Sequence, residues 1–351
     1  MATYHSTRSR TEALSAKQAI RRGIAPDGGL YVSDELGDRQ IDLAGIASKS
    51  YFELAREVLG MLLSDYTDEE IAACVEEAYG TTFASDEVTP LVKLEGAGAD
   101  GADAADTVPS YVLELWHGPT SAFKDVALQM LPRLMARTSA ADEGAADNIM
   151  IVTATSGDTG KAALAGFADA PGCGITVFYP EGKVSRVQEL QMSTQAGANV
   201  SVCAVRGNFD DAQSAVKRIF ADRDLAERLA ASGVQLSSAN SINVGRLVPQ
   251  VVYYFAAYAQ LLREGAVEFC VPTGNFGDIL AGYYAKRLGL PIAKLIVASD
   301  RNNVLFDFLT TGTYDRERPF YTTTSPSMDI LISSNLERML YYLADGDCEL
   351  V

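Results

Sequence analysis

The chain has 351 residues, 48% of them hydrophobic, which is typical of a globular protein with two domains or one large elaborated domain. Its net charge of −17 argues against binding to nucleic acid or to an anionic membrane, because both need a basic face. Only two histidines are present, which argues against a Ser-His-Asp triad, a catalytic Cys-His pair or a zinc site.

The expected location of the protein follows from its apolar runs and its cysteines. None of its apolar runs reaches the roughly 18 residues needed to span a bilayer, and the polar start does not resemble a secretory signal. The five cysteines include no CxxC pair, which favours a reducing compartment. We therefore expect a cytoplasmic protein with no metal centre, no nucleic-acid partner and no membrane partner.

Helical periodicity dominates the first part of the chain, residues 1–94. Helices are predicted over 11–24, 51–63 and 67–80, and a Pro-Asp-Gly-Gly turn at 26–29 predicts a short strand after it. A low-complexity stretch without aromatic residues follows at 95–110, and a second one occupies 139–148. Both are expected to be surface insertions or linkers.

From residue 111 the pattern changes to apolar strands that alternate with helices. Strands are predicted over 110–116, 148–155, 174–180, 199–205, 234–240, 267–274 and 293–300. Helices are predicted between them over 160–169, 185–195, 210–222 and 278–289. This alternation predicts an α/β fold in which helices cover parallel sheets on both faces. We therefore expect a helix-rich N-terminal domain (1–94), a linker (95–110) and an α/β region (111–351) with a smaller subdomain at about 115–205.

The loop that follows the predicted strand 148–155 offers hydroxyls and amides at a helix start. Its members are Thr155, Ser156, Gly157, Asp158, Thr159 and Gly160. A helix N-terminus attracts anions through its unpaired N–H groups and its dipole. A Walker A phosphate loop is excluded, because Thr155 stands where that motif needs Gly and Ala162 where it needs Ser or Thr. The alternative is a plain cap in which Asp158 or Thr159 satisfies the helix start.

A second glycine-containing loop lies between a predicted strand and the helix over 278–289. It consists of Gly274, Asn275, Phe276 and Gly277, and Asp278 follows. Two glycines three residues apart let the backbone approach an anion closely, and Asp278 can cap the helix. The GxGxxG spacing of dinucleotide-binding loops is absent. A turn without a ligand is the alternative to a phosphate site.

Lys124 stands at the start of an apolar helical pattern, directly after Phe123. A cation is disfavoured at a helix N-terminus, and the apolar neighbours Phe123 and Val126 suggest a desolvated amine. Desolvation lowers the pKa of a lysine and frees its amine as nucleophile and base. The alternative is a solvated surface lysine. A reactive lysine together with two phosphate-type loops indicates pyridoxal phosphate as the cofactor.

Five ordered motifs resemble the threonine synthase family, which belongs to the β-family (fold type II, tryptophan synthase β-like) of pyridoxal-phosphate enzymes. Three of them are HGPTSAFKD (117–125), TATSGDTG (153–160) and GNFGD (274–278). The other two, at 13–32 and 327–340, are similar to sequences of the same family. The resemblance runs from about residue 4 to about residue 343 and is interrupted only by the two low-complexity stretches.

The resemblance implies roles for the residues of the three loops. Lys124 would bind the cofactor covalently and shuttle protons, and Phe123 would wall the cofactor. Residues Gly274, Asn275, Phe276, Gly277 and Asp278 would hold the cofactor phosphate. Residues Thr155, Ser156 and Thr159 would receive the substrate carboxylate, with Ser156 and Asp158 facing the cofactor. Many relatives have Asn where this chain has Asp158, and an anion there would repel a ring phenolate.

A further segment, 237–247, fits the substrate-phosphate pocket of the family through Asn240, Ser241 and Arg246. The alternative for Arg246 is an ion pair with a surface carboxylate. The resemblance implies a carbon–oxygen lyase, monomeric or homodimeric, that converts O-phospho-L-homoserine and water into L-threonine and phosphate. Another pyridoxal-phosphate phospholyase or ammonia-lyase of the same fold, or a catalytically silent fragment, remains an alternative.

The chain stops at Val351, whereas members of the family usually continue well past the motif at 327–340. The segment beyond that motif carries a hydroxyl residue that faces the pyridine nitrogen. The resemblance therefore implies either a fragment of a longer protein or a shortened relative.

Overall fold

The computed structural model describes residues 3–95, 108–138, 146, 148–262 and 265–351. Most of the predicted linker (95–110) and of the second low-complexity stretch (139–148) lies outside these residues. Among the described helices, none is both long enough and apolar enough to cross a membrane.

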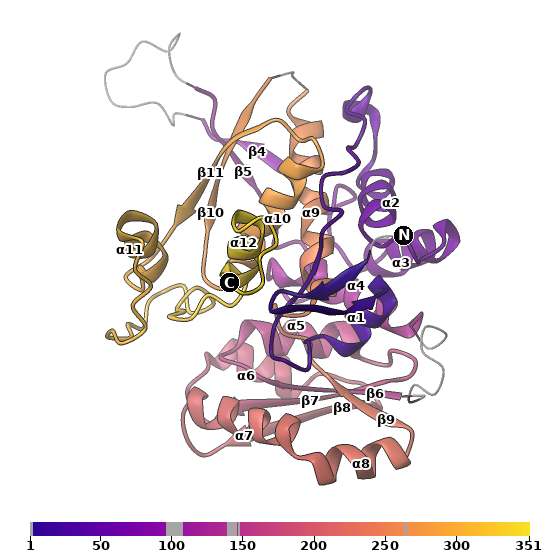
Figure 1. Cartoon of the computed structure of the whole chain (residues 1–351), viewed down its shortest axis with the longest axis vertical. Coiled ribbons are helices and arrows are strands. Elements are labelled where there is room, and N and C mark those ends of the chain that lie inside the picture. Colours follow the sequence, from indigo (N-terminus) through magenta and orange to yellow (C-terminus); the bar gives the residue numbers. More distant parts are fainter. Residues whose placement is uncertain (1–2, 96–107, 139–145, 147, 263–264) are drawn as a thin grey trace.

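A four-stranded parallel sheet with the order β8-β7-β6-β9 forms the lower part of the molecule in Figure 1. Its strands are β6 (Asn148–Ala154), β7 (Cys173–Pro180), β8 (Val200–Val205) and β9 (Val234–Ser237). The accompanying helices are α5 (Asp158–Phe167), α6 (Arg186–Ser193), α7 (Phe209–Ala221) and α8 (Arg223–Ala231). Helix α5 lies on one face of the sheet, while α7 covers the other and packs on Val152 and Ala154 of β6. The sheet is therefore covered on both faces, as predicted.

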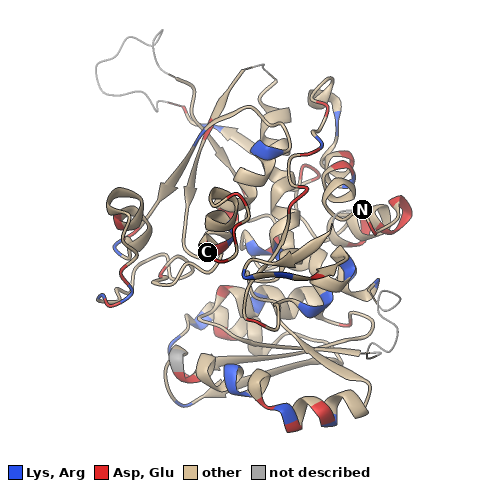
Figure 2. Cartoon of the chain, in the orientation of Figure 1, with Lys and Arg blue, Asp and Glu red and all other residues tan. Residues whose placement is uncertain are grey.

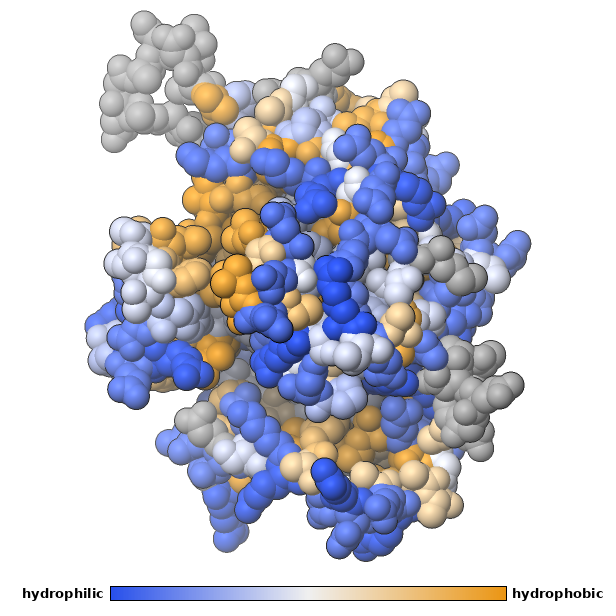
Figure 3. All heavy atoms as spheres, viewed as in Figure 1, coloured by the Kyte–Doolittle hydropathy of each residue, from blue (hydrophilic) through white to orange (hydrophobic). Residues whose placement is uncertain are grey.

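The upper part contains a second parallel pair, β10 (Val267–Pro272) and β11 (Ile292–Ala298). The other elements of this part are α9 (Val244–Gln260), α10 (Gly277–Arg287), α11 (Val304–Thr311) and α12 (Leu336–Leu343). The surface near β10, β11 and α12 is apolar in Figure 3. Ile296 on β11 and Leu343 at the end of α12 are both exposed.

The N-terminal part combines a small antiparallel sheet with helices. The sheet has the order β2-β1-β3, with β1 (Tyr4–Ser6), β2 (Ser9–Leu14) and β3 (Tyr31–Ser33). The helices are α1 (Ala16–Arg22), the short 3-10 helix η1 (Ile46–Ser48), α2 (Tyr51–Leu62) and α3 (Asp68–Tyr79). Acidic residues line α3 in Figure 2, including Asp68, Glu69 and Glu70 in its first turn. The chain continues through the antiparallel pair β4 (Leu91–Lys93) and β5 (Tyr111–Leu113) to α4 (Lys124–Ala136).

Helix α9 forms the centre of the core. Every residue from Val244 to Ala259 is buried, and the helix packs against α2, α4 and α10. Helix α4 also packs against α5, so it links the central helices to the four-stranded sheet. This packing places the starts of α4, α5, α9 and α10 in one region of the molecule.

The predicted α/β class is confirmed, but three local predictions differ from the structure. The segment 11–24 is not one helix, because residues up to Leu14 form β2 and the helix starts only at Ala16. The segment 110–116 contributes β5, which pairs antiparallel with β4 rather than joining a parallel sheet. Helix α9, the longest of the described helices, lies outside the predicted helices. The proposed domain boundaries stay a prediction, and the four-stranded sheet extends past residue 205 to include β9.

Candidate active site

Lys124 is the first residue of α4, and its side chain is buried. No side chain caps this helix at Phe123, and the Lys124 Nζ lies 4.6 Å from the centroid of the Phe123 ring. Only 8% of Lys124 is exposed, and burial lowers the pKa of its amine to about 8. The alternative of a solvated lysine is therefore wrong. At pH 7 about a tenth of this amine is then uncharged, far more than for an ordinary lysine, and the uncharged form is the one that acts as nucleophile or base.

The loop before Lys124 is held by the next residue, Asp125. Its carboxylate accepts hydrogen bonds from the Thr120 amide (2.9 Å), the Thr120 hydroxyl (2.7 Å) and the Ala122 amide (3.3 Å). Burial raises the pKa of Asp125, and these hydrogen bonds oppose that rise. The sequence prediction overlooks Asp125, although an acidic residue in the first turn of a helix is itself a signal of this kind of contact.

The loop at the start of α5 is shaped by Thr155 and Gly157. The Thr155 hydroxyl accepts hydrogen bonds from the amides of Gly157 (3.0 Å) and Gly160 (2.8 Å), so it stabilises the loop itself. Gly157 has φ 140°, a conformation that strains any residue with a side chain, and a Cβ there would lie 2.3 Å from the Gln188 Oε1, so the Gln188 side chain would have to move. No side chain caps α5, so the plain cap by Asp158 or Thr159 is not observed.

The first-turn side chains of α5 differ in their surroundings. Ser156 is exposed, and Thr159 is partly buried. The Asp158 carboxylate accepts a hydrogen bond from the Gln188 Nε2 at 3.0 Å and lies 3.2 Å from the Lys161 Nζ. Burial opposes ionisation of Asp158, but the charges of Lys124 and Lys161 and the Gln188 hydrogen bond hold its pKa below the usual value. Asp158 is therefore an ionised group close to the reactive amine.

The start of α10 offers backbone amides that no side chain caps. Phe276 occupies the cap position with φ 64°, in the left-handed region. The Asp278 carboxylate accepts hydrogen bonds from the hydroxyls of Tyr253 and Tyr254 on α9, so its side chain does not close the helix start. The first-turn amides, together with the positive end of the helix dipole, can therefore hold a phosphate group.

Residues from the last part of the chain fix the loop before α10. The Ser333 hydroxyl donates to the Gly274 carbonyl, and the Asn335 amide donates to the Asn275 carbonyl at 3.0 Å. The Asn335 side chain also donates to the Ser241 carbonyl at 3.1 Å. Asn335 thus joins two predicted site loops, a role that the sequence does not reveal because the three residues are far apart in the chain.

Asn240, Ser241 and Arg246 surround the start of α9. The Asn240 Oδ1 accepts a hydrogen bond from the Thr153 hydroxyl at 2.8 Å, which ties this loop to the end of β6. The Arg246 guanidinium is 4% exposed and donates to the Ala239 carbonyl, while its Nε has no hydrogen-bond partner among the described residues. Burial lowers the pKa of Arg246 to about 10. The predicted alternative, an ion pair at the surface, is wrong, and a buried cation with a free donor suits an anionic ligand.

These groups converge on the Lys124 amine. Its charge interacts with those of Asp158, Lys161 and Arg246, and with that of Asp278 at the start of α10. A Cβ at Gly277 would lie 3.9 Å from the Ser241 Cβ, so the loop before α10 and the loop before α9 are neighbours. A buried amine, an uncapped helix start and an incompletely paired guanidinium in one region fit pyridoxal phosphate and a second anion.

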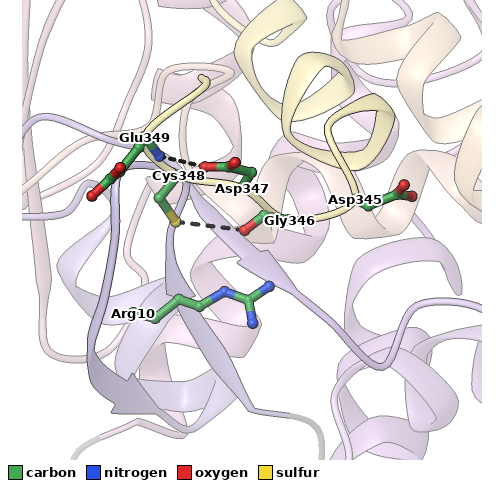
Figure 4. A pocket seen from close by; sticks show the side chains of 6 residues that line it. All are labelled: Arg10, Asp345, Gly346, Asp347, Cys348 and Glu349. Carbon is green, nitrogen blue, oxygen red and sulfur yellow. Dashed lines mark hydrogen bonds between the residues drawn. The ribbon is translucent and has the colours of Figure 1, made fainter.

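Separate from these residues, a surface depression of about 370 Å³ lies between Arg10 and the end of the chain, residues 345–349 (Figure 4). It contains none of the residues discussed above. Within the described residues, no group of three or more His, Cys, Asp or Glu side chains is placed to hold a metal ion.

Comparison with known proteins gives matches to two family models. Residues 84–349 match the model described as pyridoxal-phosphate dependent enzyme, and residues 3–79 match the model described as threonine synthase N terminus. Together the two models cover nearly the whole chain.

Named relatives point to the same family. The chain is 42% identical to threonine synthase from Pseudomonas aeruginosa over 97% of its own length and 68% of that protein. It is 41% identical to threonine synthase from Saccharomyces cerevisiae over 97% of its own length and 66% of that protein. The crystal structure of pyridoxal-phosphate-bound threonine synthase from Brucella melitensis superimposes with a TM-score of 0.87 at 44% identity, covering 99% of this chain and 71% of that one.

The chain belongs to the threonine synthase family. This membership confirms the family, the fold type and the pyridoxal-phosphate cofactor that the motifs predict. The chain spans about two thirds of the length of the curated threonine synthases that it matches, 66% and 68% in the two cases above.

Proposed function

We propose that this chain carries the active site of a threonine synthase. The reaction is the conversion of O-phospho-L-homoserine and water into L-threonine and phosphate, with pyridoxal phosphate as cofactor. The observation that carries the proposal is the buried Lys124 amine, whose pKa of about 8 leaves it reactive, between two uncapped helix starts and a buried arginine. Family membership supports this choice among the reactions of the fold.

Each anion of the proposed reaction has a suitable group in the site. The first-turn amides of α10 suit the cofactor phosphate, and the first turn of α5 with Ser156 and Thr159 suits the substrate carboxylate. Arg246, with Asn240 and Ser241 beside it, suits the phosphate of the substrate, because a guanidinium binds phosphate through charge-assisted hydrogen bonds. The cofactor phosphate is thus assigned to the start of α10, and the substrate phosphate to the start of α9.

Lys124 is the group that we assign to proton transfer. Pyridoxal phosphate, when bound, supplies a conjugated ring that withdraws electrons from the substrate α-carbon. The Lys124 Nζ would take the α-proton and return a proton at the end of the reaction, which needs an amine whose pKa is close to the working pH. Burial of the amine supplies that pKa and also restricts access of water to it.

The first test is reduction with borohydride after incubation of the protein with pyridoxal phosphate, followed by peptide mass mapping. We expect a pyridoxyl adduct on Lys124. Lys161, a second buried lysine in the same region, is the internal control and should stay unmodified. An adduct on Lys161 or on surface lysines alone would contradict the proposal.

Turnover of a substrate panel then separates threonine synthase from related activities. Phosphate release would be measured with O-phospho-L-homoserine, O-phospho-L-serine and O-phospho-L-threonine. Ammonia release would be measured with L-serine and L-threonine. We expect turnover of O-phospho-L-homoserine with formation of L-threonine. Preference for another member of the panel would indicate a different lyase, and cofactor loading without any turnover would indicate a catalytically silent chain.

We also propose that the protein is cytoplasmic and is a monomer or a homodimer. Size-exclusion chromatography with light scattering can distinguish the monomer from the homodimer.

A further inference from the structure

A second buried lysine, Lys161, lies beside the Lys124 site. It belongs to the first turns of α5, and only 8% of it is exposed. Its Nζ donates to the Thr120 carbonyl at 3.0 Å and lies 3.2 Å from the Asp158 Oδ1. Burying an ammonium group is costly unless it is paired and hydrogen-bonded. The two contacts offset that cost and connect α5 to the loop that precedes Lys124.

Thr120 is held from both sides by these contacts. Its amide and hydroxyl donate to the Asp125 carboxylate, at 2.9 and 2.7 Å. Its carbonyl accepts from Lys161 and also from the Gln191 Nε2 on α6, at 3.3 Å. The loop is thereby fixed four residues before Lys124, and two donors share the same carbonyl oxygen. One of these donors, Gln191, is uncharged, so a positive charge is not needed to hold the loop.

The charge of Lys161 acts on a different partner, Asp158. This carboxylate interacts with both lysines, and the Gln188 Nε2 donates to the same Oδ1. The charged groups that face Lys124 are Asp158 and Lys161 from α5, Arg246 from α9, Asp278 from α10 and Asp125 from its own helix. Without Lys161, Asp158 would be an uncompensated carboxylate next to Lys124, and the two would form a closer ion pair.

We propose that Lys161 is a positioning residue that shares the Asp158 carboxylate with Lys124 and so weakens the ion pair between Asp158 and the Lys124 amine. The same contact compensates the negative charge of Asp158 in a region that receives anionic ligands. The proposal rests on the proposed function in one respect: Lys124 must be able to lose its proton in order to react with the cofactor. Burial of Lys124 lowers the pKa of its amine, and the positive charge of Lys161 acts in the same direction.

The test measures how the reactivity of Lys124 depends on pH in the cofactor-free 351-residue chain. Competitive labelling with acetic anhydride, normalised to free phenylalanine and read by peptide mass mapping, gives the midpoint of Lys124 acetylation. In Lys161→Met we expect this midpoint to rise by roughly one pH unit, because one positive charge is lost and Asp158 becomes available to Lys124. Lys161→Arg keeps the charge and should keep the wild-type midpoint.

Gln191→Ala is the matched control for a purely structural role. It removes the other donor to the Thr120 carbonyl without changing any charge, and we expect an unchanged midpoint. An unchanged midpoint in Lys161→Met, or an equal rise in Gln191→Ala, would overturn the proposal. If circular dichroism shows that Lys161→Met does not fold, Lys161→Gln decides, because its amide can still donate to the Thr120 carbonyl while the charge is lost. Its midpoint should rise, and a midpoint equal to that of the wild type would count against the proposal. No substrate is present, so the outcome is independent of the borohydride and turnover tests.

Discussion

Arg246 and Arg338 are both buried arginines, but their guanidinium groups are satisfied to different extents. Arg338 donates through its Nε to the Tyr31 carbonyl (2.9 Å), through its Nη2 to the Ile242 carbonyl (2.6 Å) and through its Nη1 to the Asn335 side chain. Arg246 donates to the Ala239 carbonyl, and its Nε is unpaired among the described residues. Arg338 therefore stabilises the fold, whereas Arg246 retains a donor for a ligand.

We expect Arg246→Met to separate stability from binding. Affinity for inorganic phosphate, measured by calorimetry on protein loaded with pyridoxal phosphate so that the α10 start is occupied, should fall by about 10- to 100-fold, since hydrogen bonds to charged groups contribute about 1.5–3 kcal/mol. The free energy of unfolding in urea should change by less than about 1 kcal/mol, because an incompletely paired buried charge contributes little to stability.

The matched variant is Arg338→Met. It leaves three acceptors without their donor, so we expect a loss of about 2–4 kcal/mol in the free energy of unfolding. If Arg246→Met destabilised the protein as strongly as Arg338→Met, the interpretation of Arg246 as a ligand-binding residue would be wrong.

Single residues also show how far sequence reasoning reaches. Lys124 and Arg246 can be identified because each stands in a local context, a helix start and a phosphate-type segment, that gives it meaning. Lys161 cannot, because a lysine on a helix is usually solvated, and its burial depends on Thr120 in a loop that is 41 residues away. Asn335 is a similar case, since it joins loops at positions 241 and 275.

Among the elements, local signals identify α2, α3 and α5 because their apolar residues recur on one face. Helix α1 has a capping box, in which Ser15 and Gln18 bond reciprocally. That motif is the local signal that the helix starts after residue 14. The preceding β2 contains Glu, Ala and Leu, which are good helix formers, and it becomes a strand only through its pairing with β1. Pairing with a distant partner is the information that a local pattern lacks.

The contact between α4 and α5 depends on Gly166. A Cβ at this position would lie 2.0 Å from the backbone carbonyl oxygen of Leu128 on α4, so the two helices would have to move apart. This movement would alter the site, because α4 starts with Lys124 and α5 starts with Asp158. The close approach of these helices therefore determines how the two site loops lie relative to each other.

We expect Gly166→Ala to lower the free energy of unfolding by about 1–3 kcal/mol, the range for overpacking in a core. Alanine is intrinsically the better helix former by about 0.5–1 kcal/mol, so the loss is smaller than the steric cost alone. Gly60→Ala in α2 is the control, because nothing lies within 4 Å of its Cβ position. It should gain about 0.5–1 kcal/mol. Urea unfolding of both variants checks the pair, and a stabilised Gly166→Ala would contradict the packing argument.

At the scale of the whole molecule, the first and last described segments are packed together. The Tyr341 hydroxyl on α12 accepts a hydrogen bond from Arg10 at 2.7 Å, donates to Asp34 and lies 3.1 Å from the His5 Nε2. Figure 4 shows Arg10 facing the turn that follows α12. Helix α12 also carries Arg338, which donates to the Asn335 side chain, and Asn335 in turn donates to the Ser241 carbonyl. The packing of α12 therefore supports the loops of the site.

The sequence predicts the parallel α/β class because strand and helix alternate locally, and this part of the prediction holds for the described residues. It does not predict that β1 and β3 meet α12, because the groups in contact are separated by more than 300 positions, as the contact between Tyr341 and Asp34 shows. Such contacts depend on the complete set of packed faces and leave no periodic signal. The fold class can thus be predicted from local sequence patterns, whereas the long-range contacts that support the site loops cannot.

Tyr341→Phe tests whether the contact between the chain's two end segments contributes to the stability of the whole molecule. The variant keeps the ring but removes the hydroxyl that Arg10, Asp34 and His5 share, and it leaves a half-buried charged cluster less satisfied. We expect a loss of about 1–3 kcal/mol in the free energy of unfolding. Tyr283→Phe is the control, because the one hydrogen bond that its hydroxyl makes with the described residues is solvent-exposed and comes from Arg287. This variant should stay within about 0.5 kcal/mol of the wild type. If the end segments support the site loops, limited proteolysis of Tyr341→Phe should also cleave earlier near β1 and β2 than in Tyr283→Phe, and equal cleavage would show that the cluster is local.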